Sequence, residues 1–468
     1  MLFSSMTFLF VFMPLVMAVY FLSKKEIRNY VLLIASIIFY AWGEPRYLAI
    51  MIITILVNYA GAILLDKHYS SRQRLWIVSL TIVLDLSFLF YFKYFNFVVD
   101  NINGVLATDF QLLDVIMPIG ISFYTFQAMS YLIDVYRREV PAQKDVYKLA
   151  LYIVLFPQLV AGPIVKYHDV CEQIDNRTIE FKNVIIGFKR FITGLAKKVL
   201  IANTLAEVVD KIFAQAPENL TTGVSWLGAV AYCLQLYYDF SGYSDMAIGL
   251  GLMFGFRFLE NFNYPYISKS ITEFWRRWHI SLATWFKLYL YIPLGGNRKG
   301  AVRTYWNLFA VFLVTGIWHG AAWSYVAWGI WNGIFIVIER FFGLDKDKND
   351  RWYVSAAKYV YAFFAIVWGM IIFRAESLSY AYEYICRMLH IDVTKHLPDY
   401  DYGVNNKFAI MLIVGLICAM PVCRSLIYIK YEHKVQRTLV NIWLFLLFFW
   451  STISLAASTY NPFIYFRF

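Results

Sequence analysis

The stretch TGIWHGAAW carries one ionisable ring, His319, in sequence that is otherwise apolar enough for a membrane. A charged side chain at the centre of a spanning helix costs about 2.5–3.5 kcal/mol, so such residues are rare without a use. Burial disfavours the imidazolium form, so a neutral ring that acts as a general base is expected. Gly316 and Gly320 would leave room for a substrate, while Trp318 and Trp323 would exclude water. The alternative is a packing histidine bonded to a carbonyl of a neighbouring helix.

His279, in the segment RRWHISL, is a second histidine that could take part in chemistry. The guanidinium groups of Arg276 and Arg277 would hold the pKa of this imidazole down or position an anionic ligand. Trp275 and Trp278 would contribute to the same site. The alternative is an interfacial belt of tryptophan and arginine in which the histidine is a bystander.

Two carboxylates, Asp239 and Asp245, lie inside the otherwise apolar stretch YYDFSGYSDMAIG. They could orient a histidine, as in carboxylate–imidazole pairs, or bind the hydroxyl groups of an acceptor. Alternatively, each could cap a helix end if the chain breaks at Ser241 and Gly242. Both interpretations stay open on the sequence alone.

The turn GGNRKG presents Asn297, Arg298 and Lys299, which could hold the phosphate groups of a donor at the cytoplasmic face. It is equally typical of a positively charged cytoplasmic loop. No metal site is expected, because the seven histidines show no ligand spacing such as H-x-x-x-H.

Residues 461–468 form an aromatic tail, NPFIYFRF, with one phenol, Tyr465, among three phenylalanines. Such a tail favours an apolar environment over water. Either it lies in the membrane interface as an anchor, or it inserts into a funnel in the protein and presents Tyr465 there.

Membrane helices must position these residues, because 60% of the 468 residues are hydrophobic and only 16% are charged. A spanning helix needs about 20 predominantly apolar residues. The clearest apolar runs are Met6–Leu22, Tyr30–Trp42, Ala49–Leu65, Leu75–Phe92, Val115–Ile133, Leu149–Val165, Phe309–Ile338, Tyr359–Phe373, Phe408–Pro421 and Leu439–Leu455. We predict an all-α integral membrane protein with about eleven transmembrane helices.

Two segments in the middle third are too charged to span a bilayer. Phe188–Leu205 has four basic residues at helical spacing, which favours an amphipathic interfacial helix. Ile271–Gly300 places Trp275 and Trp285 on one predicted helical face. Polar helices at membrane depth need protein or a water-filled cavity around them. We therefore expect re-entrant or interfacial helices around a central funnel or tunnel.

The basic residues indicate the orientation of the chain. They concentrate in alternate loops, which predicts cytoplasmic loops there and an amino terminus outside. The net charge of +11 is explained by these loops, so no nucleic-acid partner is expected. No linker or internal repeat interrupts the pattern, which favours a single membrane domain over residues 1–468.

Six ordered motifs carry a resemblance to a known family over nearly the whole chain. They are YYDFSGYSDMAIG, NFNYPY, FWRRWHISL, YIPLGGNRKG, GIWHGAAW and FIYFRF. The chain resembles the membrane-bound O-acyltransferases, and within them the bacterial alginate O-acetyltransferase-like branch. The resemblance implies a multi-helix fold with a tunnel, in which His319 matches the signature histidine and His279 the second one.

The resemblance also implies an activity. An acyl group, expected to be acetyl, would pass from a cytosolic thioester such as acetyl-CoA to a hydroxyl of an exported polysaccharide or cell-wall glycan. An extracytoplasmic esterase-like partner would complete the transfer, at the cytoplasmic membrane of a bacterium and with no bound cofactor. His319 would deprotonate the acceptor hydroxyl. We add the hypothesis that Tyr465 relays the acyl group covalently.

Two other functions stay open. Within the same family, D-alanylation of teichoic acid would use a carrier-protein thioester as donor. From a different class, a proton-coupled transporter would also place Asp85, Asp239, Asp245 and His319 in the membrane, although it would predict repeated halves that the sequence does not show.

Overall fold

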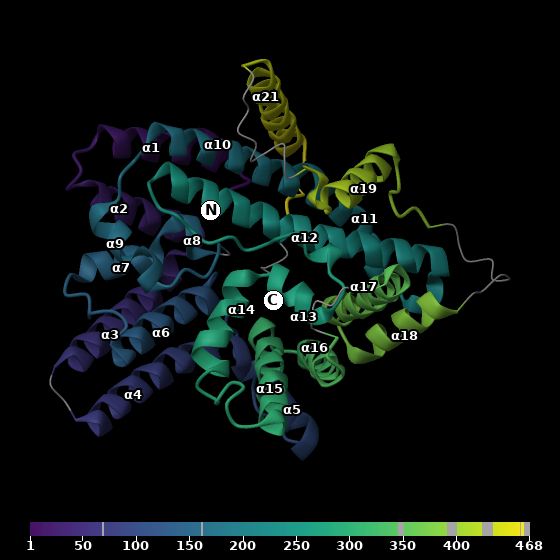
Figure 1. Ribbon diagram of the computed structural model, residues 1–468, viewed down its shortest axis with the longest axis horizontal. Helices are drawn as coiled ribbons and strands as arrows, with labels where there is room; N and C mark the ends of the chain where they lie inside the picture. The colour runs from purple at the N-terminus through teal and green to yellow at the C-terminus, as the bar shows by residue number, and fades with distance from the viewer. Residues whose placement is uncertain are drawn as a thin grey trace. The chain divides into compact units, whose positions relative to one another are not determined.

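The computed structural model describes residues 1–67, 70–160, 162–344, 351–390, 400–423, 434–458 and 460–462. Every regular element in these ranges is a helix, as Figure 1 shows, so the predicted all-helical class is confirmed. The chain forms two compact units, Met1–Phe191 with Ser244–Leu259, and Ile192–Tyr243 with Glu260–Phe468. Two helices, α10 (Phe181–Ala196) and α12 (Thr222–Met253), contribute residues to both.

The first unit is built mainly from the first half of the chain. Its other helices are η1 (Phe8–Phe12), α1 (Met13–Leu22), α2 (Arg28–Ala41), η2 (Pro45–Tyr47), α3 (Leu48–Asp66), α4 (Ser71–Leu89), η3 (Phe90–Tyr94), α5 (Phe95–Leu106), α6 (Ile121–Arg137), α7 (Val146–Val154), α8 (Phe156–Leu159) and α9 (Tyr167–Asn176). The helices α3, α4 and α6 pack against one another and lie side by side in Figure 1. Asn58 on α3 donates to both carboxylate oxygens of Asp85 on α4, at 2.9 and 3.0 Å, which is a polar contact of the kind that joins membrane helices.

The predicted span Leu149–Val165 is wrong. Helix α7 ends at Val154, Leu155 is not helical, and the short helix α8 begins at Phe156 with Pro157 in its first turn. The apolar residues of α7 and α8 are buried in the protein. Their hydrophobicity therefore serves the core of this unit, because two short helices of this length cannot cross a bilayer.

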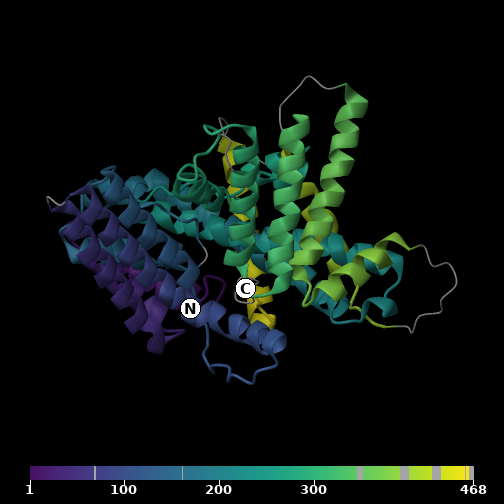
Figure 2. The same ribbon diagram turned by 90° about the horizontal axis from the view of Figure 1, so that it is seen from below.

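The second unit contains the candidate site. Its helices, besides parts of α10 and α12, are η4 (Lys197–Ala202), α11 (Asn203–Phe213), η5 (Pro217–Asn219), η6 (Pro265–Ile267), α13 (Ile271–Arg277), α14 (Ile280–Phe286), η7 (Lys287–Tyr291), α15 (Ala301–His319), α16 (Trp323–Phe342), α17 (Trp352–Arg374), α18 (Leu378–Leu389), α19 (Asn406–Cys418), η8 (Pro421–Cys423) and α21 (Lys434–Ala457). Helix α16 packs against both α15 and α17, and the three green helices stand side by side in Figure 2.

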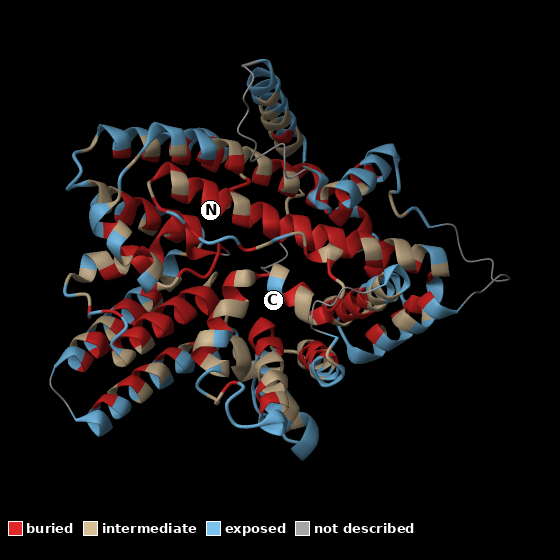
Figure 3. Ribbon diagram, viewed as in Figure 1, coloured by how far each residue is buried: buried red, intermediate tan, exposed pale blue. Residues whose placement is uncertain are grey.

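Four helical stretches among the described residues are long and apolar enough to cross a membrane: Pro45–Asp66, Ser71–Leu106, Trp352–Arg374 and Val435–Ala457. Three shorter apolar helices accompany them, Phe8–Leu22, Arg28–Ala41 and Asn406–Cys418. Helix α21 exposes most of its apolar side chains, as the tan and pale blue colours in Figure 3 show. Exposed apolar surface of this extent fits contact with lipid. The predicted count of eleven spans stays a prediction.

The segment Phe188–Leu205 is helical, as predicted, through α10, η4 and the start of α11. Two of its four basic residues, Arg190 and Lys198, are nevertheless buried. An interfacial helix keeps its cations in water or among lipid headgroups, so this part of the prediction is wrong. The buried cations are instead paired with carboxylates of α12, as described below.

Candidate active site

His319 is the last residue of α15 and lies in an aromatic enclosure. Its side chain is buried, and three ring centroids lie within about 5 Å of its own: Trp318 at 4.9 Å, Trp328 at 5.0 Å and Phe373 at 5.2 Å. These rings come from α15, α16 and α17. The chain leaves the helix directly after the histidine, because Gly320 is extended. The imidazole therefore lies at a helix end, buried among three aromatic rings.

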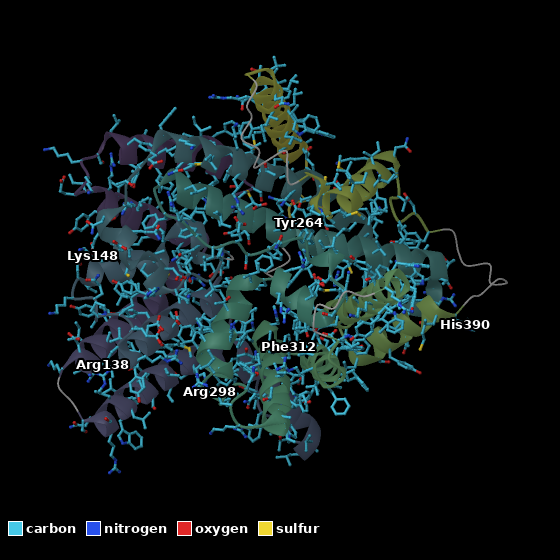
Figure 4. The ribbon with its side chains drawn as sticks, in the orientation of Figure 1. Arg138, Lys148, Tyr264, Arg298, Phe312 and His390 are labelled. Atoms are coloured by element: carbon cyan, nitrogen blue, oxygen red, sulfur yellow. The ribbon has the colours of Figure 1, made fainter. Side chains whose placement is uncertain are left out.

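The two glycines beside His319 do not leave room for a substrate, contrary to the sequence-based expectation. A Cβ atom added at Gly316 would lie 2.9 Å from Cα of Gly329 on α16, and one at Gly320 would collide with the ring of Tyr325. The glycines therefore allow the backbones of α15 and α16 to approach closely. Phe312, labelled on α15 in Figure 4, lies one turn before Gly316 and packs against the ring of Trp275 at 5.3 Å.

His279 lies in a break between two helices. Helix α13 ends at Arg277 and α14 begins at Ile280, so the predicted continuous helical face through Trp275 and Trp285 is wrong. The backbone of His279 is left-handed, with φ of 47°, a conformation that costs a residue other than glycine free energy. Such strain persists only where surrounding contacts hold it, and it often marks a functional site.

The contacts of His279 determine which nitrogen carries its proton. Nδ1 lies 3.1 Å from Oδ1 of Asn261, and the backbone N–H and the hydroxyl of Ser281 donate to the same oxygen at 3.2 and 2.9 Å. A backbone N–H can only donate, so the Asn261 atom in this position is the oxygen and accepts. Nδ1 of the neutral ring must then be the protonated nitrogen. Nε2 is left as the atom that can accept a hydrogen bond or a proton.

Burial lowers the pKa of the His279 imidazole to about 3, so the ring is neutral at physiological pH. The helices that flank it, α13 and α14, have seven residues each and are not among the spanning helices. The arginines do not supply this effect, contrary to expectation. Arg276 is exposed, and Arg277 pairs with Glu273 at 2.9 Å and donates to the carbonyl of Asn263.

One indole connects the two histidines. The ring centroid of Trp318 lies 6.4 Å from that of His279 and 4.9 Å from that of His319. On its other side, His279 meets the ring of Phe240 from α12 edge to face at 4.6 Å. The pair of imidazoles is thus surrounded by residues of six helices that belong wholly or partly to the second unit: α12, α13, α14, α15, α16 and α17.

A buried carboxylate, missed by the sequence analysis, fixes the start of α13. Glu339 on α16 is fully buried and accepts the backbone N–H groups of Ile271 at 2.5 Å and Thr272 at 2.8 Å. The hydroxyl of Tyr361 on α17 donates to the same carboxylate at 3.1 Å. A carboxylate at a helix amino terminus satisfies unpaired N–H groups and complements the helix dipole. Glu339 therefore ties the helix that precedes His279 to the helices that enclose His319.

The predicted tryptophans occupy different environments. Trp275 is buried and its indole N–H donates to Oδ1 of Asn332 on α16 at 3.0 Å. Trp278 is buried and stacks on Phe274 at 5.4 Å. Trp323, the first residue of α16, is 55% exposed, so it does not form part of the closed wall around His319.

The two predicted carboxylates of α12 form ion pairs with cations, and α12 does not break at Ser241. The carboxylate of Asp239 lies 2.6 Å from Nζ of Lys198, in a pair whose side chains are each 3% exposed. In the first unit, Asp245 accepts from Arg190 at 2.8 and 3.0 Å. The alternative of helix-end capping is therefore wrong. Figure 3 shows α12 buried along most of its length.

The predicted phosphate loop and the tail are placed only in part. Asn297, Arg298 and Lys299 are exposed, and the hydroxyl of Tyr291 donates to the side chain of Asn297; Figure 4 labels Arg298 in this loop before α15. Tyr465 lies outside the described residues.

Imidazole nitrogens in a closed aromatic surrounding can accept a proton from a hydroxyl, and the apolar helices place this chemistry in a membrane protein. The fold therefore defines a multi-pass membrane protein with two buried imidazoles close together. The model of the membrane-bound O-acyltransferase family matches residues 37–375, and the chain belongs to this family. The protein is thus an O-acyltransferase.

Several curated proteins are similar to this chain. A probable alginate O-acetylase, AlgI, of Pseudomonas putida is 42% identical over an alignment of 500 residues that covers 100% of both chains. A peptidoglycan O-acetyltransferase of Helicobacter pylori is 32% identical and covers 93% of this chain and 89% of its own. A teichoic acid D-alanyltransferase of Bacillus subtilis is 28% identical over 56% of this chain and 70% of its own.

Proposed function

We propose that the protein transfers an acetyl group from a cytosolic thioester, acetyl-CoA, to a hydroxyl group of an exported polysaccharide or cell-wall glycan. The relatives named as alginate O-acetylases or as a peptidoglycan O-acetyltransferase align over 81–100% of the chain, whereas the D-alanyltransferase of Bacillus subtilis aligns over 56%. Acetyl is therefore favoured over D-alanyl as the transferred group. The transporter alternative is not favoured, because the family and these relatives are transferases.

The observation that carries this proposal is the enclosed pair of histidines. His319 would take the proton of the attacking hydroxyl, and the acyl carbon would change partners from sulfur to oxygen. The proton then passes to the departing thiolate, so that an ester and a thiol are produced. Because α15 ends at His319, the negative end of its dipole would stabilise the imidazolium that forms transiently. Nε2 of His279 would accept a hydrogen bond from the acceptor or donor and so hold it beside Trp318.

The loop that contains Arg298 and Lys299 is the proposed site for the phosphates of the donor. Both side chains are exposed and precede α15, the helix that carries His319. Replacement of both by glutamine is expected to raise the KM for acetyl-CoA and leave kcat near the wild-type value. An unchanged KM would assign the two cations to membrane orientation only.

Tyr465 is the proposed covalent relay. In the first transfer the acyl–sulfur bond breaks, the acyl–phenol ester forms and the phenol proton leaves on the thiol. In the second, a hydroxyl of the outer acceptor takes the acyl group and returns a proton to the phenolate. Tyr465→Phe removes one oxygen and should abolish transfer to the outer acceptor. Full transfer by this variant would overturn the relay.

The cellular setting is proposed from the same reasoning. About eleven spans in one membrane domain would place the amino terminus outside a bacterial cytoplasmic membrane. The acyl group would enter from the cytosol, and an extracytoplasmic esterase-like partner would hand it to the glycan. Asp239 and Asp245 are proposed to act in this domain through their ion pairs rather than on the substrate directly.

The donor can be identified with purified protein in lipid vesicles. Labelled acetyl-CoA and a labelled D-alanyl carrier protein are supplied in parallel, and the label transferred to an added glycan or to the protein is measured. We expect transfer from acetyl-CoA. Transfer from the D-alanyl carrier alone would overturn the choice of acyl group, and proton-coupled uptake without transfer would overturn the proposed reaction.

A further inference from the structure

The segment that follows α21 is held by polar side chains of the second unit. Residues 460–462 of this segment each form a hydrogen bond with η4 or α11. The hydroxyl of Tyr460 donates to Asp210 at 2.6 Å, the side chain of Asn203 donates to that of Asn461 at 3.0 Å, and Lys198 donates to the carbonyl of Pro462. Two of these bonds use side chains of the segment, so the contact depends on its sequence and not only on its backbone.

The carbonyl of Pro462 is one of several acceptors around the buried ammonium group of Lys198. Nζ of Lys198 also contacts the carboxylate of Asp239 at 2.6 Å and Oδ1 of Asn203 at 2.8 Å. An ammonium group has three donors and can therefore engage several acceptors at once. Departure of the segment would remove one acceptor from a cation whose side chain is 3% exposed, which is unfavourable.

Asp239, which pairs with Lys198, directly precedes a residue that contacts His279. Asp239 is followed on α12 by Phe240, whose ring meets the His279 ring at 4.6 Å. Lys198, which binds Pro462, thus pairs with the residue directly before the one whose ring contacts His279.

A second series of contacts connects the segment with the surroundings of His319. Asp210, the acceptor for Tyr460, also binds the guanidinium group of Arg374 at 2.9 Å. Arg374 is the last residue of α17 and directly follows Phe373, one of the rings around His319. Both ends of the segment are therefore held by residues whose ion-pair partners directly neighbour, in the sequence, an aromatic residue in contact with one of the two histidines.

We propose that Lys198, Asn203 and Asp210 form a docking site for residues 460–462 and are positioning residues for acyl transfer. Tyr465 follows Pro462 by three positions, and an extended chain of that length spans at most about 11 Å. Docking of residues 460–462 thereby limits the distance between the Tyr465 phenol and the docking site, which favours the proposed transfer. The catalytic part of this inference rests on the proposed function, whereas the docking itself does not.

The test uses the whole protein in lipid vesicles and compares Asn203→Ala, Asn461→Ala and the double variant. Asn461→Ala should lower kcat for acetyl transfer about five- to tenfold, which corresponds to one lost hydrogen bond, with the KM for acetyl-CoA unchanged. Asn203→Ala should lower kcat at least as much, because it also removes an acceptor of Lys198. The double variant should be no slower than Asn203→Ala, because the contact that Asn461→Ala removes is already lost in that variant. Asn461→Asp retains the acceptor oxygen and should retain activity. Glu207→Ala, at an exposed position one turn further along α11, is the matched control.

Hydrogen exchange of the amides of residues 460 and 461, followed by mass spectrometry, measures docking without reference to activity. Exchange should accelerate in Asn203→Ala and not in Glu207→Ala. Unchanged exchange, unchanged kcat in both single variants, or losses that multiply in the double variant would each overturn the docking site. A wild-type protein that transfers no acyl group but shows this exchange difference would overturn the proposed function and leave the docking in place.

Discussion

Nδ1 of His279 and Oδ1 of Asn261 lie 3.1 Å apart, and the amide of Ser281 donates to the same oxygen. This arrangement fixes the orientation of the asparagine and therefore the tautomer of the histidine. The histidine presents Nε2 as an acceptor although its backbone is left-handed.

Replacing Asn261 by leucine should impair transfer, because the N–H of the imidazole and the donors of Ser281 lose their acceptor. We expect a loss of about 10- to 100-fold in kcat, the size of effect found for residues that orient metal-binding histidines. Asn261→Asp keeps the acceptor but adds a carboxylate, which raises the pKa of the imidazole. The activity of the Asn261→Asp variant should therefore begin to fall at a higher pH than that of the wild type. A leucine variant with wild-type activity, or an aspartate variant with an unshifted profile, would refute this role.

The pH dependence of stability should report the burial of His279. Its pKa is lowered to about 3 from an ordinary value of 6.5, so between these values the unfolded chain binds a proton that the folded chain does not. Its contribution to stability is complete above about pH 6.5 and is lost progressively as the pH falls toward 3. The midpoint of thermal inactivation should therefore fall more steeply with acid in the wild type than in His279→Gln. Parallel curves would show that the buried imidazole does not titrate in this way.

Glu339 should stabilise the start of α13. Glu339→Leu leaves the N–H groups of Ile271 and Thr272 without this acceptor and should destabilise the protein by about 2 kcal/mol or more. Glu339→Gln retains an acceptor oxygen and should lie between the leucine variant and the wild type. The comparison is made by thermal inactivation, with the exposed Glu376→Ala as control. Equal stability of the leucine variant would contradict the capping role.

The substitution Gly316→Ala tests whether this glycine serves helix packing or substrate binding. An added methyl group would press on the backbone of α16, so Gly316→Ala should destabilise the protein by about 1–3 kcal/mol. Gly104→Ala is the control, because a Cβ atom there meets nothing within 4 Å. A variant of normal stability with a raised KM would instead support the original idea that this glycine makes room for substrate.

Hydropathy and motif spacing predicted much of the fold because burial in lipid demands long apolar helices. The predicted span Ala49–Leu65 matches α3 within one residue at each end, whereas Tyr359–Phe373 ends one residue before α17 does and begins seven residues after it. Hydropathy failed at Leu149–Val165, since a helix buried in protein and one buried in lipid have the same composition. Pro157 was the available signal that no continuous helix runs there.

The histidines could be found from sequence, but their surroundings could not. Glu339 lies near the end of an apolar run, so the sequence alone indicates only the end of a predicted helix there. The N–H groups that it binds lie 67 and 68 residues away in the sequence. Lys198 and Asp239 are each conspicuous as charges in apolar sequence, yet nothing local indicates that they pair. The left-handed break at His279 has no glycine or proline to announce it, because tertiary contacts impose it.

The most direct test of the account is the rate at which purified protein in vesicles transfers labelled acetyl from acetyl-CoA, with wild type, His319→Ala and His168→Ala side by side. His168 is an exposed histidine outside the site and serves as the control. We predict that His319→Ala lowers kcat about 10²- to 10⁴-fold, the range for loss of a general base, while His168→Ala has no effect. Transfer by His319→Ala at the wild-type rate, from a folded protein, would contradict the central role of this histidine.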